Sequence, residues 1–370
     1  MKIMPFRAVA PNLDKVPHSS DFFDTVKYRY HEYAAEGLFQ STEPEAMYIY
    51  QIKNANGQKR NGLVVATDIA EYFNGNMKPH EKTIVTNEEL QSELLHTRGA
   101  AIKPILLSYS PVSELNDLIA NYIETHKKFY VIELGLEKHR FWQITEGGVM
   151  DKIRQIFEEK IPSAYIADGH HRAASFASMH KMSPNDKTNK MLSAYFPENT
   201  LKIDAFHRVV TDLNGLSSDD FLEKLKQIFK IKIIRLATLP YSRFEMTMFL
   251  EDKWFQLYWR KDFLKQFSDA SPEGLVLLDV HLLNEKILKP ILGIKNIRSD
   301  SRLKCIDGQQ GLEKVVKTAG TEGVGFCLLP IEWDDLKAVV DSHGTLPPKS
   351  TFFEPRMKNG LLVYELKVPS

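Results

Sequence analysis

The sequence contains little cysteine, and the cysteines that it has are not arranged for chemistry. Only two of the 370 residues are cysteines, Cys305 and Cys327. Neither lies at the spacing of a metal-binding motif or next to a cluster of other metal-ligating residues. The composition therefore favours two reduced, partly buried thiols over a disulfide or a zinc site.

The sequence also has no excess of charge of either sign and no long apolar run. Lys and Arg total 48, as do Asp and Glu, so the basic surface of a general nucleic-acid or membrane binder is missing. No apolar run approaches the ~18 residues that a membrane span needs. Pro5 and Arg7 interrupt the N-terminal stretch, where a signal peptide has a continuous apolar core. We therefore expect a cytoplasmic protein without nucleic-acid or membrane partners.

The length of the chain indicates two domains, because 370 residues exceed the usual size of a single hydrophobic core. Helical and strand-like segments follow one another in a mixed order, which favours an α+β fold over a regular doubly wound sheet. The pattern changes near PENTLKID, residues 197–204. We place the boundary there, between a domain of residues 1–204 and a second, mixed α+β domain of residues 205–370.

The segment YIADGHHRAASF, residues 165–176, joins a strand to a helix through a short polar turn. Gly169 permits a tight turn, and His170–Arg172 would occupy the first turn of the helix. Cations are disfavoured at a helix N-terminus, so their presence there indicates that an anion such as phosphate binds. Asp168 could hold Mg²⁺ between phosphate oxygens. The structural alternative is a helix cap followed by packing histidines; zinc is disfavoured because adjacent histidines point apart on a helix.

Two other stretches contain residues suited to a binding site. MKPHEKT, residues 77–83, places His80 and Glu81 in a loop, where functional side chains are common. LPPKST, residues 346–351, puts a lysine and two hydroxyls after a stiff Pro-Pro pair, which suits an anion or an amino acid. Each stretch taken alone is also an ordinary surface loop. The pair Asn359–Gly360, further along, predicts a hairpin turn followed by a strand.

Taken together, these stretches resemble the free L-serine kinase family, which has a ParB/sulfiredoxin-like catalytic fold, and its many bacterial homologues. ADGHHR is present whole from Ala167 to Arg172. The segments "PF+A" at Met4–Ala8, "HE" at His80–Glu81, "HRVV" at His207–Val210 and "PPKST" at Pro347–Thr351 occur in the expected order. The resemblance spans nearly the whole chain.

The resemblance implies a kinase that transfers a phosphoryl group from a nucleotide, ATP or ADP, to the hydroxyl of free L-serine or a similar small metabolite, with Mg²⁺. Residues 1–204 would form the ParB/sulfiredoxin-like nucleotide-binding domain, to which the 346–358 loop of the second domain returns. Glu81 would be the base or orienting group, and Asp168 would assist the metal or the hydroxyl. Phosphates would be bound by Gly169, His170, His171 and Arg172, and the acceptor by His80, Lys349, Ser350 and Thr351.

Two features depart from that pattern. Many relatives have a PPYD segment near the N-terminus, and the corresponding DKVPHSSDFFDTV of this chain lacks it. No GxxxxGK[ST] loop or kinase-type glycine-rich loop is present, so the DGHHR turn would have to hold the nucleotide. The alternatives are a ParB-like nucleotide-binding switch and a non-catalytic metabolite sensor. Glu81 distinguishes them, because only a kinase needs an acid beside the acceptor hydroxyl.

Overall fold

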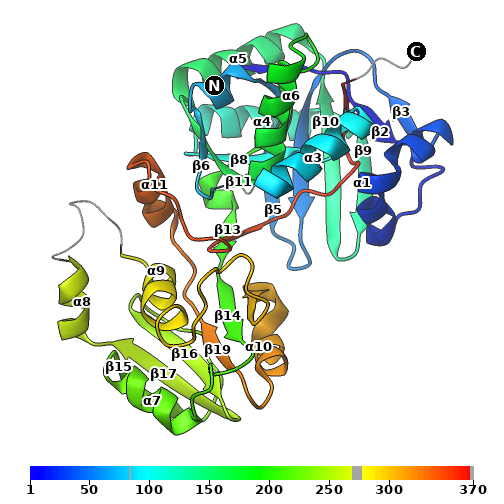
Figure 1. Ribbon diagram of the computed structural model, residues 1–370. Coiled ribbons are helices and arrows are strands. Elements are labelled where there is room, and N and C mark those ends of the chain that lie inside the picture. Colours follow the sequence, from blue (N-terminus) through cyan, green and yellow to red (C-terminus); the bar gives the residue numbers. More distant parts are fainter. Residues whose placement is uncertain (83–84, 269–276, 367–370) are drawn as a thin grey trace. The chain divides into compact units, whose positions relative to one another are not determined.

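The computed structural model describes residues 1–82, 85–268 and 277–366, which form two units (Figure 1). The first unit consists of Met1–Lys202 together with the C-terminal residues from Pro355 onward, and the second of Ile203–Glu354. The α+β class expected from the sequence is confirmed. The boundary lies two residues before the position expected, and the C-terminal residues, expected in the second domain, belong to the first unit. Among the described helices, none combines the length and hydropathy required to cross a bilayer.

The first unit is built on a nine-stranded mixed sheet with the order β6-β11-β8-β12-β5-β4-β10-β9, and with β1 added alongside β5. Two small additional sheets pair β2 with β3 and β7 with β21. The strands are β1 (Ile3–Met4), β2 (Val9–Pro11), β3 (Phe39–Ser41), β4 (Met47–Lys53), β5 (Lys59–Asp68), β6 (Met77–Pro79), β7 (Ala100–Ala101), β8 (Ile105–Tyr109), β9 (Tyr130–Leu134), β10 (Glu137–Ile144), β11 (Ala164–Asp168), β12 (Lys190–Pro197) and β21 (Tyr364–Glu365).

Helices complete the first unit. They are α1 (Ser20–Ala35), α2 (Ala70–Phe73), α3 (Val85–Arg98), α4 (Ser113–Thr125), α5 (Gly147–Lys160), α6 (His170–Met182) and the short 3₁₀ helix η1 (Glu198–Thr200). The α3 helix packs against α6, and Figure 1 shows the two side by side. Phe157 of α5 lies 5.0 Å, between ring centroids, from Tyr195 of β12. Central strands such as β4 and β8 are buried almost throughout, as expected for strands covered on both faces.

The C-terminal residues are held to the first unit by several separate contacts. Tyr364 pairs with Ala101 across β21 and β7, and Val363 pairs with Val9. The Tyr130 hydroxyl donates a hydrogen bond to the Leu361 carbonyl. Because these contacts are distributed along the segment, residues 355–366 form an integral part of the first unit rather than a loose tail.

The second unit is built on an antiparallel six-stranded sheet with the order β15-β17-β16-β19-β14-β18. Its core includes Val209, Phe249, Val315 and the buried thiol of Cys327. The strands are β13 (Lys202–Asp204), β14 (Phe206–Val210), β15 (Phe229–Ile234), β16 (Glu245–Leu250), β17 (Lys253–Trp259), β18 (Leu303–Asp307), β19 (Val324–Cys327) and β20 (Phe352–Glu354), the last paired with β13. The helices are α7 (Ser218–Lys226), α8 (Lys261–Ser268), α9 (Asp279–Leu283), the π-helical η2 (Asn284–Leu288), the 3₁₀ helix η3 (Gly308–Gln310), α10 (Gly311–Ala319) and α11 (Trp333–Asp341).

Both cysteines lie in this unit and both are free thiols, as the composition predicted. Burial raises the pKa of the Cys327 thiol to about 12, so this group is inert at neutral pH. Cys305 is only partly buried, and its sulfur lies 3.2 Å from a guanidinium nitrogen of Arg208.

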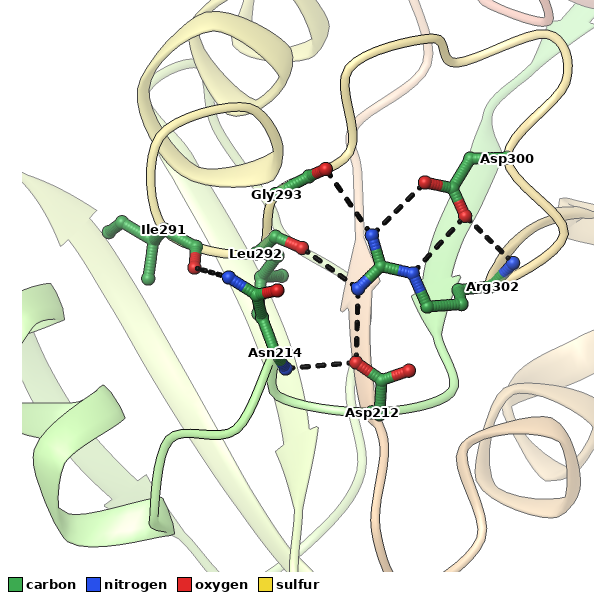
Figure 2. Close-up of polar contacts among 7 residues, drawn as sticks. All are labelled: Asp212, Asn214, Ile291, Leu292, Gly293, Asp300 and Arg302. Carbon is green, nitrogen blue, oxygen red and sulfur yellow. Dashed lines mark hydrogen bonds and ion pairs between the residues drawn. The ribbon is translucent and has the colours of Figure 1, made fainter.

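One arginine of the second unit connects the loop after β14 with the segment between η2 and β18 (Figure 2). The Arg302 guanidinium forms a two-pronged contact with Asp300, at 3.1 and 3.3 Å, and a third ionic contact with Asp212 at 3.1 Å. It also donates to the carbonyl oxygens of Leu292 and Gly293 at 3.2 and 3.3 Å. All three guanidinium nitrogens therefore have acceptors within the protein. We call Arg302, Asp212, Asp300 and these carbonyls the Arg302 network.

Candidate functional site

The HE and DGHHR segments, far apart in the sequence, lie next to each other in the first unit. Strands β6 and β11 are adjacent and parallel, with Pro79 opposite Ile166, so both strands end at the same edge of the sheet. The His80 backbone N–H donates to Nε2 of His170 at 3.3 Å, and the two imidazole centroids are 4.4 Å apart. Glu81 is the residue after His80 in the chain, and its side chain is half-buried. The strand register therefore unites the two motifs.

The turn between β11 and α6 needs its glycine. Gly169 has φ = +105°, in the region that side-chain-bearing residues rarely adopt. A Cβ at this position would lie 2.8 Å from a guanidinium nitrogen of Arg172. Because Arg172 folds back over the turn, any larger residue would meet backbone strain and would also displace the end of the Arg172 side chain. The helix α6 begins immediately after, with the Ala173 N–H bonded to the Gly169 carbonyl at 2.9 Å.

Three cations surround the carboxylate of Asp168, and we call them the cation cluster. Arg172 and Lys103 contact the Asp168 Oδ2 atom at 2.7 and 3.3 Å. Arg356, from the C-terminal segment, acts on the same carboxylate through its charge. The Asp168, Lys103 and Arg172 side chains are 28%, 23% and 19% exposed, so solvent or a ligand can reach them. Three positive charges against one negative charge leave an excess of two among these four side chains.

The electrostatics of the cluster keep the acid ionised. Burial alone would raise the pKa of Asp168, but Arg172, Lys103 and Arg356 outweigh it and hold the pKa well below its usual value. Burial also lowers the pKa of Lys103, an effect that the neighbouring Asp168 charge opposes. An ionised Asp168 thus attracts all three cations to one carboxylate.

Two histidines of the site, His80 and His170, are neutral rather than cationic at pH 7. Burial lowers the pKa of His80 to about 4, although a hydrogen bond with the Ile166 backbone and the Asp168 charge act in the opposite direction. Burial and the adjacent His80 lower the pKa of His170 well below its usual value. His171 is half-buried in the first turn of α6, and its carbonyl accepts the Ser175 hydroxyl at 2.7 Å. The sequence analysis treated the imidazoles at this turn as cations, and for His170 this is wrong, because the ring is neutral.

Lys103 and Arg356 supply charge that the sequence reasoning did not anticipate. Lys103 precedes Pro104 at the start of β8, and Arg356 lies beyond the PPKST segment. Neither residue belongs to a recognisable motif. Only the long-range pairing of β8 and of the C-terminal segment brings them to Asp168, so no local signal in the sequence could have identified them.

Arg172, expected to bind phosphate, is engaged with the protein in this conformation. Besides Asp168, its guanidinium donates to the carbonyl oxygens of Lys103 and Pro104 at 3.2 and 2.5 Å. It therefore fixes the end of β11 against the start of β8. A role in phosphate binding stays a prediction for this residue.

The donor set of the site does not fit a Mg²⁺ ion held by the protein alone. The described residues contain no group of three His, Cys, Asp or Glu side chains arranged for a metal. The one expected ligand, Asp168, already accepts contacts from Lys103 and Arg172. Since a hard divalent cation prefers several free oxygens, we derive no chemical step from a metal at this position.

The expected acceptor-binding loop, Lys349–Thr351, belongs to the second unit. There the fully buried Arg208 of the HRVV segment donates to the carbonyls of Pro348 and Lys349, at 2.9 Å each. Lys349 has φ = +57°, and its ammonium lies 5.4 Å from the centre of the Phe206 ring. The Ser350 hydroxyl is buried and donates to the Pro347 carbonyl at 2.6 Å. The HRVV and PPKST segments therefore form one local structure, and contact between this loop and the nucleotide site stays a prediction.

Known proteins provide a family assignment and weak structural likenesses. The chain is similar to SbnI with C-terminal truncation from Staphylococcus aureus, with 13% identity, 80% of this chain and 85% of that chain covered, and a TM-score of 0.44. It is also similar to a mutant free serine kinase in complex with ADP, with 16% identity, coverages of 82% and 92%, and a TM-score of 0.40. A conserved hypothetical protein from Pyrococcus furiosus gives 14% identity, coverages of 80% and 94%, and a TM-score of 0.38.

Likenesses of this size do not bear on the activity of the chain, and no curated protein matches it. The family match is more extensive. Residues 8–281 match the model of a family described as "Protein of unknown function (DUF1015)". Because this match spans well over half of the 370 residues, the chain belongs to the DUF1015 family.

Proposed function

We propose that this protein is a nucleotide-dependent phosphotransferase that binds phosphates where β11 meets α6. The observation that carries the proposal is the cation cluster, in which Lys103, Arg172 and Arg356 face the single carboxylate of Asp168 and remain partly exposed. The N-terminus of α6 adds its dipole at the same place. The acceptor is the hydroxyl of a small metabolite, and the sequence resemblance indicates free L-serine.

The residues divide the work of the reaction as follows. Phosphoryl transfer depends mainly on alignment and on neutralising the charge of the phosphate oxygens, which Lys103 and Arg356 provide. Arg172 and Asp168 hold the ends of the strands in place. Because Nε2 of His170 accepts the His80 N–H, the neutral His170 ring carries its proton on Nδ1 and can donate one hydrogen bond.

Glu81 is the proposed base for the acceptor. It lies at the end of β6, directly after the residue that contacts His170. The acceptor hydroxyl loses its proton to the Glu81 carboxylate, its oxygen forms a new bond to the terminal phosphorus, and the bond from that phosphorus to the nucleotide breaks. The products are a phosphate ester and the nucleotide shortened by one phosphate.

A transfer assay tests this function directly. The purified protein is incubated with labelled ATP or ADP and a panel of hydroxylated metabolites that includes L-serine, and transferred label is separated and identified. We expect label on an alcohol oxygen. Tight nucleotide binding without transfer to any acceptor would contradict the phosphotransferase and favour a switch or a sensor.

The substitution Glu81→Gln separates these possibilities. We expect the rate of transfer to fall by ~10²–10⁴, the usual contribution of a general base, while nucleotide affinity measured by calorimetry stays within twofold. Glu133→Gln is the matched control, because Glu133 is an exposed residue of the same unit that forms an ion pair with Lys138. Full activity of Glu81→Gln would remove this residue from the mechanism.

A further inference from the structure

The strand β15 lies at the end of the six-stranded sheet of the second unit (Figure 1). Within the part of the chain that the structure describes, β17 is the one strand to which it is hydrogen-bonded. An end strand of an antiparallel sheet directs the N–H and C=O groups of every second residue away from its partner. The outer side of β15, which we call the β15 edge, can therefore accept a further strand.

Apolar side chains are exposed on β15 and in the residues that follow it. Ile233 is 72% exposed, Leu236 78% and Tyr241 77%. All three lie between residues 233 and 241, so the exposure is concentrated in one stretch of the chain. Single apolar residues scattered over a surface need no explanation, whereas a concentration of this kind is typical of an interaction surface.

The charges of this stretch all have the same sign. Residues 229–242 contain Lys230, Lys232 and Arg235 and no Asp or Glu. The three cations are exposed, and none of them forms an ion pair with an acid among the described residues. An acidic partner would therefore meet cations that the protein leaves without a counter-charge.

The side chains of β15 alternate between the two faces of the sheet. Ile231 and Ile233 lie on one face, and Lys230 and Lys232 lie on the other. A strand added at the β15 edge continues both faces, because side chains directly opposite each other on neighbouring strands are ~4.5–5.5 Å apart. The complementary partner therefore has apolar residues beside the isoleucines and acidic residues beside the lysines, in alternation.

We infer that the β15 edge binds an extended acidic segment of another protein, in which Asp or Glu alternates with apolar residues. The inference is independent of the proposed function. A second copy of this chain is a poorer occupant. Any register that pairs isoleucine with isoleucine also pairs lysine with lysine, and like charges opposite each other are destabilising. A register shifted by one residue places each lysine opposite an isoleucine. The lysines thus disfavour a second copy and favour acidic residues.

A peptide series tests this inference on the intact protein. Fluorescently labelled peptides with the sequences EVEVEVE and KVKVKVK are titrated by anisotropy, together with two forms of EVEVEVE, one N-methylated at the valines and one at the glutamates. We expect EVEVEVE to bind at least tenfold more tightly than KVKVKVK, and less tightly at high salt. One of the two methylated forms should lose binding, because a strand directs alternate N–H groups to its neighbour.

Two results of this series would overturn the inference. Absence of EVEVEVE binding would show that the β15 edge does not accept an acidic strand. Undiminished binding of both methylated forms would show attraction by charge without strand addition. Sedimentation of the unmodified protein tests the other occupant: a dimer that EVEVEVE dissociates would assign the edge to a second copy of the chain and would also overturn the inference.

A charge reversal on the edge provides the second test. Lys232→Glu should weaken EVEVEVE binding at least tenfold and strengthen KVKVKVK binding. Lys314→Glu is the matched control, because Lys314 is an exposed lysine of α10 in the same unit. Lys232 is itself exposed, so we expect both variants to fold, and their melting temperatures check this. Equal effects of the two substitutions would show a response to net charge alone and would contradict binding at the β15 edge.

Discussion

Two arginine–aspartate networks in this protein use similar contacts and differ in charge balance. In the second unit, Arg302 is surrounded by two carboxylates and two carbonyl oxygens (Figure 2). In the first unit, Arg172 likewise contacts one carboxylate and two carbonyl oxygens, but Lys103 and Arg356 share that carboxylate. The Arg302 network thus has an excess of negative charge that its hydrogen bonds satisfy internally, whereas the cation cluster has an excess of positive charge.

This difference distinguishes a structural network from the anion site that we propose. A guanidinium whose nitrogens all have acceptors has little capacity left for a ligand, and its main effect is to fix loops in place. A cluster with more cations than acids gains free energy when an anion binds, because the anion reduces the repulsion among the cations. The number of charges around each arginine is therefore more informative than the presence of an arginine–aspartate pair.

The largest expected effect is a loss of unfolding free energy at acid pH, which we attribute in part to His80, a neighbour of the cation cluster. His80 has a pKa of about 4 in the folded protein, against ~6.5 when unfolded. Between these values the unfolded state binds more protons, so the stabilising contribution is complete above pH 6.5 and declines as the pH falls toward 4, by up to ~3 kcal/mol. Urea unfolding at pH 7.5, 5.5 and 4.5 measures this decline.

Two variants sharpen the acid experiment. His80→Gln should make the pH dependence of the unfolding free energy less steep, because one titrating group is removed while the buried His170, His139 and His207 remain. Arg302→Ala should keep the slope of the unmodified protein, because the Arg302 network contains no histidine. Identical slopes in all three proteins would show that His80 does not titrate as described.

A pair of arginine substitutions tests the difference between the cation cluster and the Arg302 network. We expect Arg172→Ala to weaken nucleotide binding by ~1.5–3 kcal/mol, since Asp168 and the strand ends lose a charged hydrogen-bonding partner. Arg302→Ala should lower the free energy of unfolding by about 2 kcal/mol and leave nucleotide binding unchanged. Calorimetry and chemical denaturation are measured on both variants. Loss of nucleotide binding in Arg302→Ala, or no loss in Arg172→Ala, would break the distinction between the two networks.

The smallest effect concerns Arg356, the third cation whose charge acts on Asp168. Arg356→Gln should weaken pyrophosphate binding about tenfold, the equivalent of ~1.4 kcal/mol, and should make that binding less sensitive to salt. Arg154→Gln is the control, because Arg154 pairs with Asp151 on the exposed side of α5 in the same unit. An unchanged affinity in Arg356→Gln would exclude this residue from the anion site.

The sequence predicted the local part of the site well. The apolar run before Asp168 predicted a strand, Gly169 predicted the turn and the following residues a helix; the structure has β11, φ = +105° at Gly169, and α6 in that order. Such features depend on interactions between near neighbours in the chain, and so a pattern in the sequence carries them.

Features that depend on distant segments were missed or mistaken. The turn at Asn359–Gly360 exists, with φ = +70° at Gly360, but the predicted hairpin is wrong. The Gly360 N–H bonds to the Ile102 carbonyl at 2.7 Å, and the strand that follows, β21, pairs with β7. A partner some 260 residues away replaces the local one, and no turn signal reveals it.

Burial was the second quantity that the sequence could not provide. The positions of His80 and His170 were predicted, but their charge states depend on removal from water, which a linear pattern does not specify. The same applies to Lys103 and Arg356, whose importance follows only from their proximity to Asp168. The residues of a motif were thus easier to predict than the electrostatic field around it.

The interruption of the first unit by the second has a consequence for how the protein is made. Residues 203–354 leave the ribosome before Arg356 and the strand β21 do. When the nascent chain has emerged from the ribosome only as far as Lys202, Asp168 can contact Lys103 and Arg172, but Arg356 has not yet been synthesised. The order of translation delays completion of the cation cluster until the entire inserted unit has been synthesised.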